Sequence, residues 1–219
     1  MIVVATHNDS NLLNEICKNL SRINLHNQKV LIIDTNSNDI SFINEFNYLK
    51  SFYKQFLFYR TDFKGWDSGA YIKAYENFPN EDKFIFLQDS LMIPDRSKYI
   101  QHSLELLDKY DVVAWTNFKY KFENKEQQKW SEEGLIDGIT PVDSIFGPIF
   151  SVNKKTLDLL PKKWLKTPTN KNEACGMERR WSAMFQCIGA SKYYIEHSID
   201  GDAMTYSREY ICKNFKNRN

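Results

Sequence analysis

The chain has 219 residues, of which 42% are hydrophobic and 26% charged, and its formal net charge is +1. This length suits one sizeable domain, and a nearly neutral chain has no overall basic field to attract nucleic-acid phosphates. No run reaches the roughly 18 apolar residues of a membrane span, and MIVVATHND lacks the basic start of a signal peptide, so we interpret it as a first strand.

Strands and helices alternate through the first half of the chain. Apolar runs predict strands at 1–6, 29–35, 55–60, 83–89 and 111–118. Helical spacing and cap signals predict helices at 10–23, 37–53, 67–78 and 96–110, with Asp39 as an N-cap. Short connections of this kind imply right-handed crossovers and an α/β fold, with a mainly parallel central sheet covered by helices on both faces.

A polar cluster follows each of the first four strands: THND, DTNSND, TDFKGWDSG and QDS. Ligands of parallel sheets bind beyond the carboxyl ends of the strands, so these clusters predict one shared binding edge. The alternative for any single cluster is an ordinary polar turn. The sharpest case is FIFLQDSLMI, where Asp89 follows a strand buried on both faces; its charge must be paired, solvated or bound to a ligand.

The second half of the chain is less regular. Residues 119–138 form a polar, charged insertion, which predicts a mobile loop or a small hairpin over a site. A strand with a Gly-Pro break is expected at 144–152, then a helix at 153–160 capped by Asn153, a helix at 172–189 and a closing strand at 191–197. We find no internal repeat and no low-complexity linker, which favours a single domain.

The four cysteines are scattered and show no metal-binding spacing. This pattern indicates reduced thiols in a cytoplasmic protein, although a disulfide between two of them stays open. They are Cys17, Cys175, Cys187 and Cys212.

The order of these features resembles the GT-A fold of nucleotide-sugar glycosyltransferases, especially glycosyltransferase family 2 and related small bacterial and viral enzymes. The matching segments are VVATHND, VLIIDTNSND, KGWDSGAYIKAY, FIFLQDS, FGPIFSVNKKTL and GMERRWSAMF. The resemblance covers roughly residues 1–200. It implies one Rossmann-like GT-A domain over 1–219, with a nucleotide-sugar-binding half at 1–118, an acceptor-side half at 119–200 and a tail at 201–219.

The resemblance also implies a divalent cation, Mn²⁺ or Mg²⁺, which would stabilise the departing diphosphate with oxygen ligands. Asp89 lies where the family carries its Asp-x-Asp motif, but Gln88 and Ser90 replace the second carboxylate. The resemblance suggests His197 as another metal ligand; an ordinary surface or packed histidine is the alternative.

Nucleotide recognition is expected at the first strand ends. Asp34 is the family-matched acceptor for the N3–H of a uracil ring, and Thr6 and Asn8 would touch the base or ribose. The other candidate nucleotide- and sugar-binding residues are Gly65, Trp66, Asp67, Ser68, Gln88 and Asp89. For Asp67, capping its helix is the alternative role.

Glu178 occupies the position of the family's general base, at or near the N-terminal end of a helix, where the helix dipole would lower its pKa. The alternative is a surface ion pair with Arg179 or Arg180, and Glu173 is the second candidate base. Trp181 and the two arginines could line the acceptor or phosphate side.

The resulting expectation is an inverting, metal-assisted glycosyltransferase that moves sugar from a UDP-sugar, UDP-glucose-like, to a glycan or lipid-linked acceptor hydroxyl. A non-catalytic or metal-independent nucleotide-sugar-binding relative is the main alternative. A sugar nucleotidyltransferase is disfavoured because THNDSN has neither glycine nor a basic residue, and P-loop and dinucleotide-binding motifs are absent. The basic tail at 206–219 suggests a packing helix or, at most, peripheral membrane contact.

Overall fold

A computed structural model describes residues 1–119, 121–135, 141, 143–196 and 210–213. The strands are β1 (Ile2–Thr6), β2 (Val30–Asp34), β3 (Leu57–Arg60), β4 (Lys83–Gln88), β5 (Leu91–Met92), β6 (Val112–Ala114), β7 (Asn117–Lys119), β8 (Asp143–Ile145), β9 (Phe150–Asn153), β10 (Lys192–Tyr194) and β11 (Cys212–Lys213). The helices are α1 (Ser10–Arg22), α2 (Ile40–Phe52), α3 (Trp66–Asn77), α4 (Tyr99–Leu106), α5 (Lys125–Glu132), α6 (Lys154–Asp158), a 3₁₀ turn (Lys162–Trp164) and α7 (Lys171–Cys187).

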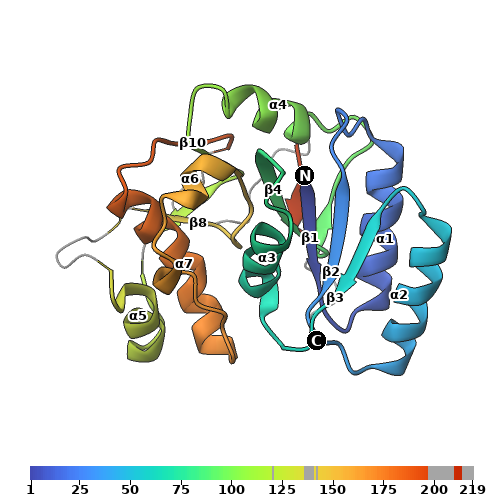
Figure 1. The fold of residues 1–219 in the computed structure, drawn as a ribbon, viewed down its shortest axis with the longest axis horizontal. Coiled ribbons are helices and arrows are strands. Elements are labelled where there is room, and N and C mark those ends of the chain that lie inside the picture. Colours follow the sequence, from blue (N-terminus) through green and yellow to red (C-terminus); the bar gives the residue numbers. More distant parts are fainter. Residues whose placement is uncertain (120, 136–140, 142, 197–209, 214–219) are drawn as a thin grey trace.

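The central sheet has seven strands in the order β10-β6-β9-β4-β1-β2-β3. The pairs β10–β6, β4–β1, β1–β2 and β2–β3 are parallel, whereas β9 runs antiparallel to both β4 and β6. The mainly parallel, mixed α/β sheet expected from the sequence is therefore confirmed. Figure 1 shows α1 and α2 on one side of the β1–β3 region and α3 on the other.

Two hydrophobic cores lie on the two faces of this sheet because neighbouring residues of a strand point in opposite directions. In β1, Val3 and Ala5 join the core that also holds residues of α3 and α7, while Ile2 and Val4 join the core that holds residues of α1 and α2. All five residues of β1 are buried. Helices therefore pack on both faces of β1, and this packing fixes the position of its carboxyl end at Thr6.

The helix caps fix the polar turns after the strands. Asp39 accepts a hydrogen bond from the Phe42 backbone amide at 2.8 Å, which confirms it as the N-cap of α2. Helix α3 begins one residue earlier than expected, with Gly65 at its N-cap position and no side-chain cap bond. Asp67 therefore does not cap α3, and its carboxylate faces the site described below.

Two predicted strands each divide into two. The segment 111–118 forms β6 in the central sheet and β7 outside it, and 144–152 forms β8 and β9 on either side of the Gly-Pro break. Strands β7 and β8 pair with each other in a separate antiparallel ribbon. Gly147 has a φ of 58°, in the left-handed region that favours glycine, so the chain can turn there from the ribbon back into the sheet.

The insertion at 119–138 was predicted to form a mobile loop or a small hairpin over a site, but its described part contains a helix. Its described part includes α5, which packs directly on α7. A Cβ on Gly176 would lie 2.9 Å from the Gln127 carbonyl oxygen and 3.0 Å from the Trp130 ring, so only glycine permits this approach. The insertion is therefore anchored to the helix that carries Glu178.

The described part of the tail is not a helix. Cys212 and Lys213 form β11, which pairs antiparallel with β5, and Ile211 is fully buried. The remaining tail residues lie outside the described ranges. Among the residues that are described, no helix combines the length and the apolar character needed to cross a membrane.

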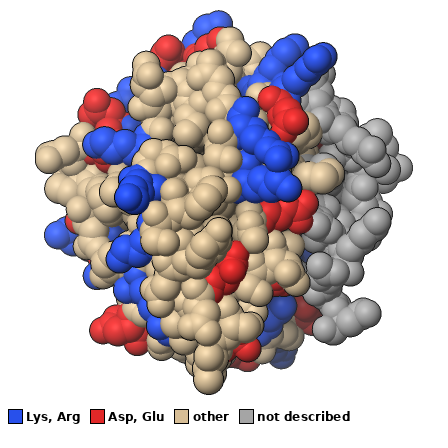
Figure 2. Space-filling model, turned by 90° about the vertical axis from the view of Figure 1, so that its right-hand side faces the viewer, with Lys and Arg blue, Asp and Glu red and all other residues tan. Residues whose placement is uncertain are grey.

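Figure 2 shows the side of the molecule that carries α1 and α2, with lysine and arginine interspersed with aspartate and glutamate. Helix α2 also exposes apolar side chains: Ile40, Tyr48 and Phe52 are 75%, 56% and 62% exposed. This face is thus mixed in character, with apolar side chains among charges of both signs.

Candidate functional site

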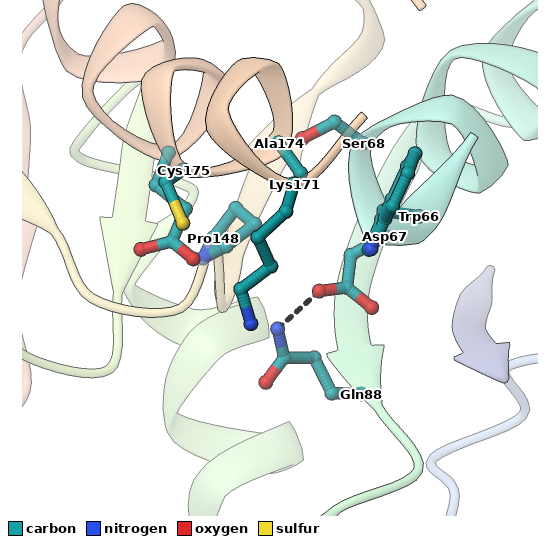
Figure 3. Close-up of a pocket in the computed structure, with 9 residues that line it drawn as sticks. Trp66, Asp67, Ser68, Gln88, Pro148, Lys171, Ala174 and Cys175 are labelled. Atoms are coloured by element: carbon teal, nitrogen blue, oxygen red, sulfur yellow. Dashed lines mark hydrogen bonds between the residues drawn. The ribbon is translucent and has the colours of Figure 1, made fainter. Parts of the chain in front are cut away.

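Two adjoining cavities lie where the carboxyl ends of the parallel strands meet α3 and α7. The larger, which we call the strand-end cavity, has a volume of about 230 Å³ and is lined by Thr6, His7, Thr35, Trp66, Asp67, Asp89 and Lys171. The smaller, the helix cavity, has a volume of about 80 Å³ and is lined by Trp66, Asp67, Ser68, Gln88, Pro148, Lys171, Ala174, Cys175 and Glu178 (Figure 3). The two share Trp66, Asp67 and Lys171, so they form one continuous site.

A wider hollow of about 620 Å³ lies near the start of β4, at the opposite edge of the sheet. Four of its charged side chains form two ion pairs: Lys83 lies 2.7 Å from Asp108, and Lys154 lies 2.7 Å from Asp158. Because these charges already neutralise each other, the strand-end and helix cavities are the better candidate for a ligand site.

Asp89 stands directly beyond β4, at the floor of the strand-end cavity. Its backbone amide donates to the Ala5 carbonyl at 3.0 Å, which continues the β1–β4 ladder, and its Oδ2 accepts from the Thr6 hydroxyl at 2.8 Å. Burial raises the pKa of Asp89 to about 7; the nearby charge of Asp67 adds to this rise, while the hydrogen bond from Thr6 opposes it. The carboxylate sits in an environment that disfavours its charge unless a cation is near.

The contact between Gln88 and Asp67 explains why the second carboxylate of the Asp-x-Asp pattern is absent beside Asp89. The Gln88 side-chain amide donates to Asp67 Oδ2, and Figure 3 shows the two side chains meeting between α3 and the end of β4. A carboxylate at position 88 could not donate this bond. The second carboxylate of the site therefore comes from α3 rather than from the residue beside Asp89.

The donor set is suitable for a hard divalent cation. Such ions bind through one or two carboxylates together with substrate phosphates and water. Two carboxylates, those of Asp67 and Asp89, line the strand-end cavity. Within the described ranges, no group of three or more His, Cys, Asp or Glu is arranged to hold a metal. His197, the other expected ligand, lies outside the described residues.

The raised pKa of Asp89 has a measurable effect on stability. The folded-state pKa of about 7 exceeds the ordinary 3.8, so ionisation of Asp89 costs no stability at low pH, and its destabilising effect grows as the pH rises from about 4 through 7. Asparagine cannot ionise, so Asp89→Asn should unfold at a higher temperature than the parent protein above about pH 7, with a smaller gain near pH 5. Thermal unfolding in chelator-containing buffer measures this difference. Asp62→Asn, at an exposed carboxylate, serves as the control, and an equal gain at both pH values would contradict the assignment.

Glu178 lies on the face of α7 that lines the helix cavity. Lys171, Ala174, Cys175 and Glu178 follow helical spacing, so one face of α7 presents all four to the cavity. The expectation that Glu178 is near the helix N-terminus is wrong: it is the eighth residue of α7, and the dipole effect fades within the first turn. Helix α7 therefore positions the Glu178 carboxylate, which lies beyond the reach of the helix dipole.

The other candidates from the same segment have structural roles. Glu173 accepts from the Thr169 backbone amide and hydroxyl at 2.6 and 2.7 Å, at the start of α7. Arg180 is fully buried and donates to the carbonyls of Trp130, Glu133 and Trp164 at 2.9–3.0 Å. These residues do not line either cavity.

The arginine and tryptophan beside them likewise do not form an acceptor or phosphate surface. Arg179 donates to the Lys121 and Cys175 carbonyls, and its Nη1 lies 3.6 Å from Glu178 Oε2. Trp181 is buried and donates to the Ser68 hydroxyl at 3.0 Å. The prediction that these side chains line a binding surface is therefore wrong, because their polar groups are engaged inside the protein.

The turn after β2 encloses Asp34. Its carboxylate is 1% exposed; Oδ1 accepts from the Ser37 amide at 3.0 Å, and Oδ2 lies 2.9 Å from Arg60 Nε. Contact between Asp34 and a uracil ring stays a prediction, one that requires Arg60 to move away. Asn8 is exposed and its side-chain carbonyl accepts from the Asn38 amide at 3.0 Å, which ties the turns after β1 and β2 together.

Gly65 does not line either cavity. A Cβ there would lie 2.6 Å from the Phe63 ring and 2.9 Å from the Gly69 Cα, so its missing side chain serves local packing. The residue after it, Trp66, lines both cavities and has a φ of 47°, a strained conformation for a bulky residue. The close packing around Gly65 holds the turn in which Trp66 takes this conformation.

Six lining residues were not predicted from the sequence: His7, Thr35, Pro148, Lys171, Ala174 and Cys175. His7 directly follows Thr6 in the first polar turn, so the strand-end rule could have included it. Cys175 and Lys171 lie three and seven residues before Glu178, which is the spacing of one helix face. Helical spacing counted backwards from Glu178 is the signal that identifies them.

Comparison with known proteins supports the fold. No protein-family model and no curated protein sequence matches the chain. Among solved structures, the chain is similar to the mannosyltransferase PcManGT from Pyrobaculum calidifontis, solved with GDP-Man and Mn²⁺: the TM-score is 0.59 and the identity 14%, over 88% of this chain and 53% of that one.

The chain is also similar to S. aureus TarS, with a TM-score of 0.52 and 12% identity over 90% of this chain and 35% of TarS. Residues 1–349 of TarS in complex with UDP give the same TM-score and identity, with 59% of that chain covered. The chain thus spans about a third to three-fifths of these structures. The likeness confirms the GT-A-like fold that the sequence predicted.

Proposed function

We propose that this protein is a metal-assisted, inverting glycosyltransferase that uses a UDP-sugar as donor. The proposal rests on two adjoining cavities at the carboxyl edge of a GT-A-like sheet. Asp67 and Asp89 line the strand-end cavity, and Glu178 lines the helix cavity. Structural neighbours solved with GDP-Man and with UDP support a nucleotide-sugar donor.

The strand-end cavity would hold the donor. Thr6, His7 and Trp66 line it with polar and aromatic groups suited to a nucleoside, and Asp67 and Asp89 would hold Mn²⁺ or Mg²⁺. When bound, this cation offsets the negative charge of the diphosphate. Thr6 keeps Asp89 oriented through its hydroxyl, and Gln88 does the same for Asp67.

The helix cavity would hold the acceptor hydroxyl. Glu178 would take the hydroxyl proton as the acceptor oxygen attacks C1 of the donor sugar from the side opposite the diphosphate. The C1–oxygen bond to the diphosphate breaks, its electron pair stays on the diphosphate, and the sugar is transferred with inversion. Ser68 and Pro148 line the cavity beside Glu178 and restrict where an acceptor can sit.

A screen of nucleotide sugars for slow donor hydrolysis tests the proposal. We expect release of a nucleoside diphosphate from at least one UDP-sugar, stimulated by Mn²⁺, because water can replace the acceptor. Nucleotide binding without hydrolysis of any donor would favour a non-catalytic binding protein, and hydrolysis unaffected by chelation would favour a metal-independent enzyme. The acceptor, a glycan or lipid-linked saccharide in this proposal, is then sought with the donor so identified.

A further inference from the structure

The joined cavities are lined by three carboxylate residues and one lysine. Asp89, Asp67 and Glu178 supply the negative charges, while Lys171 is the only lysine or arginine among the described residues that line either cavity. Any anion that enters the site therefore meets the Lys171 ammonium as its principal protein cation.

Lys171 lies at the boundary between the two cavities. It is the first residue of α7 and lines both of them, together with Trp66 and Asp67. Figure 3 shows its side chain extending from α7 toward Gln88 and Asp67, so that the amino group points into the site rather than along the helix surface.

Two other basic residues nearby, Arg60 and Lys64, contact other side chains. Arg60 Nε lies 2.9 Å from Asp34 Oδ2, and Lys64 Nζ lies 4.9 Å from the centre of the Trp66 ring. Neither residue lines a cavity. The position of Lys171 is thus not duplicated by another lysine or arginine among the lining residues that the structure describes.

We propose that Lys171 binds the terminal phosphate of the donor's diphosphate and stabilises the charge that collects there as the sugar leaves. The inference rests on the proposed function. In a donor whose nucleoside occupies the strand-end cavity and whose sugar meets an acceptor beside Glu178, the terminal phosphate must lie between the two cavities, where Lys171 is. An ammonium group at the site of developing negative charge stabilises the transition state more than the ground state.

This role adds to that of the cation which Asp67 and Asp89 would hold. With Gln88 engaged by Asp67, the chain has one carboxylate fewer beside Asp89 than the Asp-x-Asp pattern provides. The Lys171 ammonium supplies positive charge from the protein itself, and it transfers no proton during the step.

The experiment compares nucleotide binding and donor turnover in Lys171→Met, Lys171→Arg and the parent protein. Charge-assisted hydrogen bonds to phosphate are strong, so Lys171→Met should bind UDP at least about tenfold more weakly and leave UMP binding unchanged. Donor hydrolysis at saturating donor should also slow, since the lost contact is strongest in the transition state. Lys171→Arg should recover most of both losses because the positive charge is retained.

Lys125→Met is the matched control. Lys125 is also the first residue of a helix and also follows an asparagine N-cap, but it lies outside both cavities. Unchanged UDP affinity in Lys171→Met, or an equal loss of UDP and UMP affinity, would overturn the assignment while leaving the glycosyltransferase proposal intact. If the parent protein binds no nucleoside diphosphate, with or without Mn²⁺, the proposed function itself is wrong and this inference fails with it.

Discussion

Replacing Asp89 with asparagine should reduce Mn²⁺-stimulated donor turnover by about 100-fold or more, which is the size expected when a preorganised electrostatic contact to the reacting groups is lost. The substitution keeps the shape of the side chain and leaves an oxygen that can accept from the Thr6 hydroxyl, so the turn after β4 should persist. The measurement is release of nucleoside diphosphate from the donor found in the screen, followed across Mn²⁺ concentrations.

Asp67→Asn and Asp62→Asn sharpen this test. Asp67 lines the same cavity, so its substitution should also weaken the Mn²⁺ response, whereas Asp62 is exposed and lines neither cavity, so its substitution should have no effect. Unchanged turnover in Asp89→Asn would remove this residue from the metal role. Loss of activity through unfolding is the other explanation for a slow Asp89→Asn variant. The expected rise in its unfolding temperature excludes this, because a variant more stable than its parent has not lost activity by unfolding.

Replacing Glu178 with glutamine should reduce sugar transfer by about 100-fold to 10,000-fold while donor binding stays close to that of the parent protein. Glutamine fills the same space beside Ala174 and Pro148 but cannot take a proton from an acceptor. Two measurements separate binding from chemistry: titration calorimetry with UDP reports the donor site, and product formation with acceptor reports the transfer step.

Glu173→Gln provides the comparison for Glu178→Gln. Glu173 lies on the same helix but is engaged by Thr169, outside both cavities, so its substitution should affect the stability of α7 more than transfer. Retained transfer in Glu178→Gln, together with lost transfer in Glu173→Gln, would show that the base has been assigned to the wrong carboxylate.

Much of the fold could be predicted from the sequence because its signals are local. The mostly apolar strands β1, β2 and β4 are buried on both faces, and such runs can be recognised without knowledge of the partner strand. Asp39 as an N-cap follows from its position before a helical pattern. The same logic identified Asp89, since a carboxylate at the end of a buried strand of a parallel sheet lies at the edge where ligands bind.

The parts that could not be predicted depend on contacts between distant segments. The Gln88–Asp67 hydrogen bond joins β4 to α3, and the sequence shows only that Gln88 has replaced a carboxylate, not that Asp67 faces it. Asp34 was expected to contact the uracil ring because it matches the family's acceptor position, and the sequence did not show that Arg60 at the end of β3 pairs with it. In both cases the sequence shows which residues are polar or charged. Which of them pair with each other depends on how neighbouring strands and helices pack.

The buried guanidinium of Arg180 limits how the insertion at 119–138 can be exchanged. Its hydrogen bonds end on carbonyls of the insertion, at Trp130 and Glu133, and on Trp164. A shortened or exchanged insertion that lacks those carbonyls would leave a charge without partners in the protein interior, at a cost of several kcal/mol. A chimaera that exchanges the insertion should therefore carry over the residue at position 180 with it as one module, even though Trp130 and Arg180 are 50 positions apart in the chain.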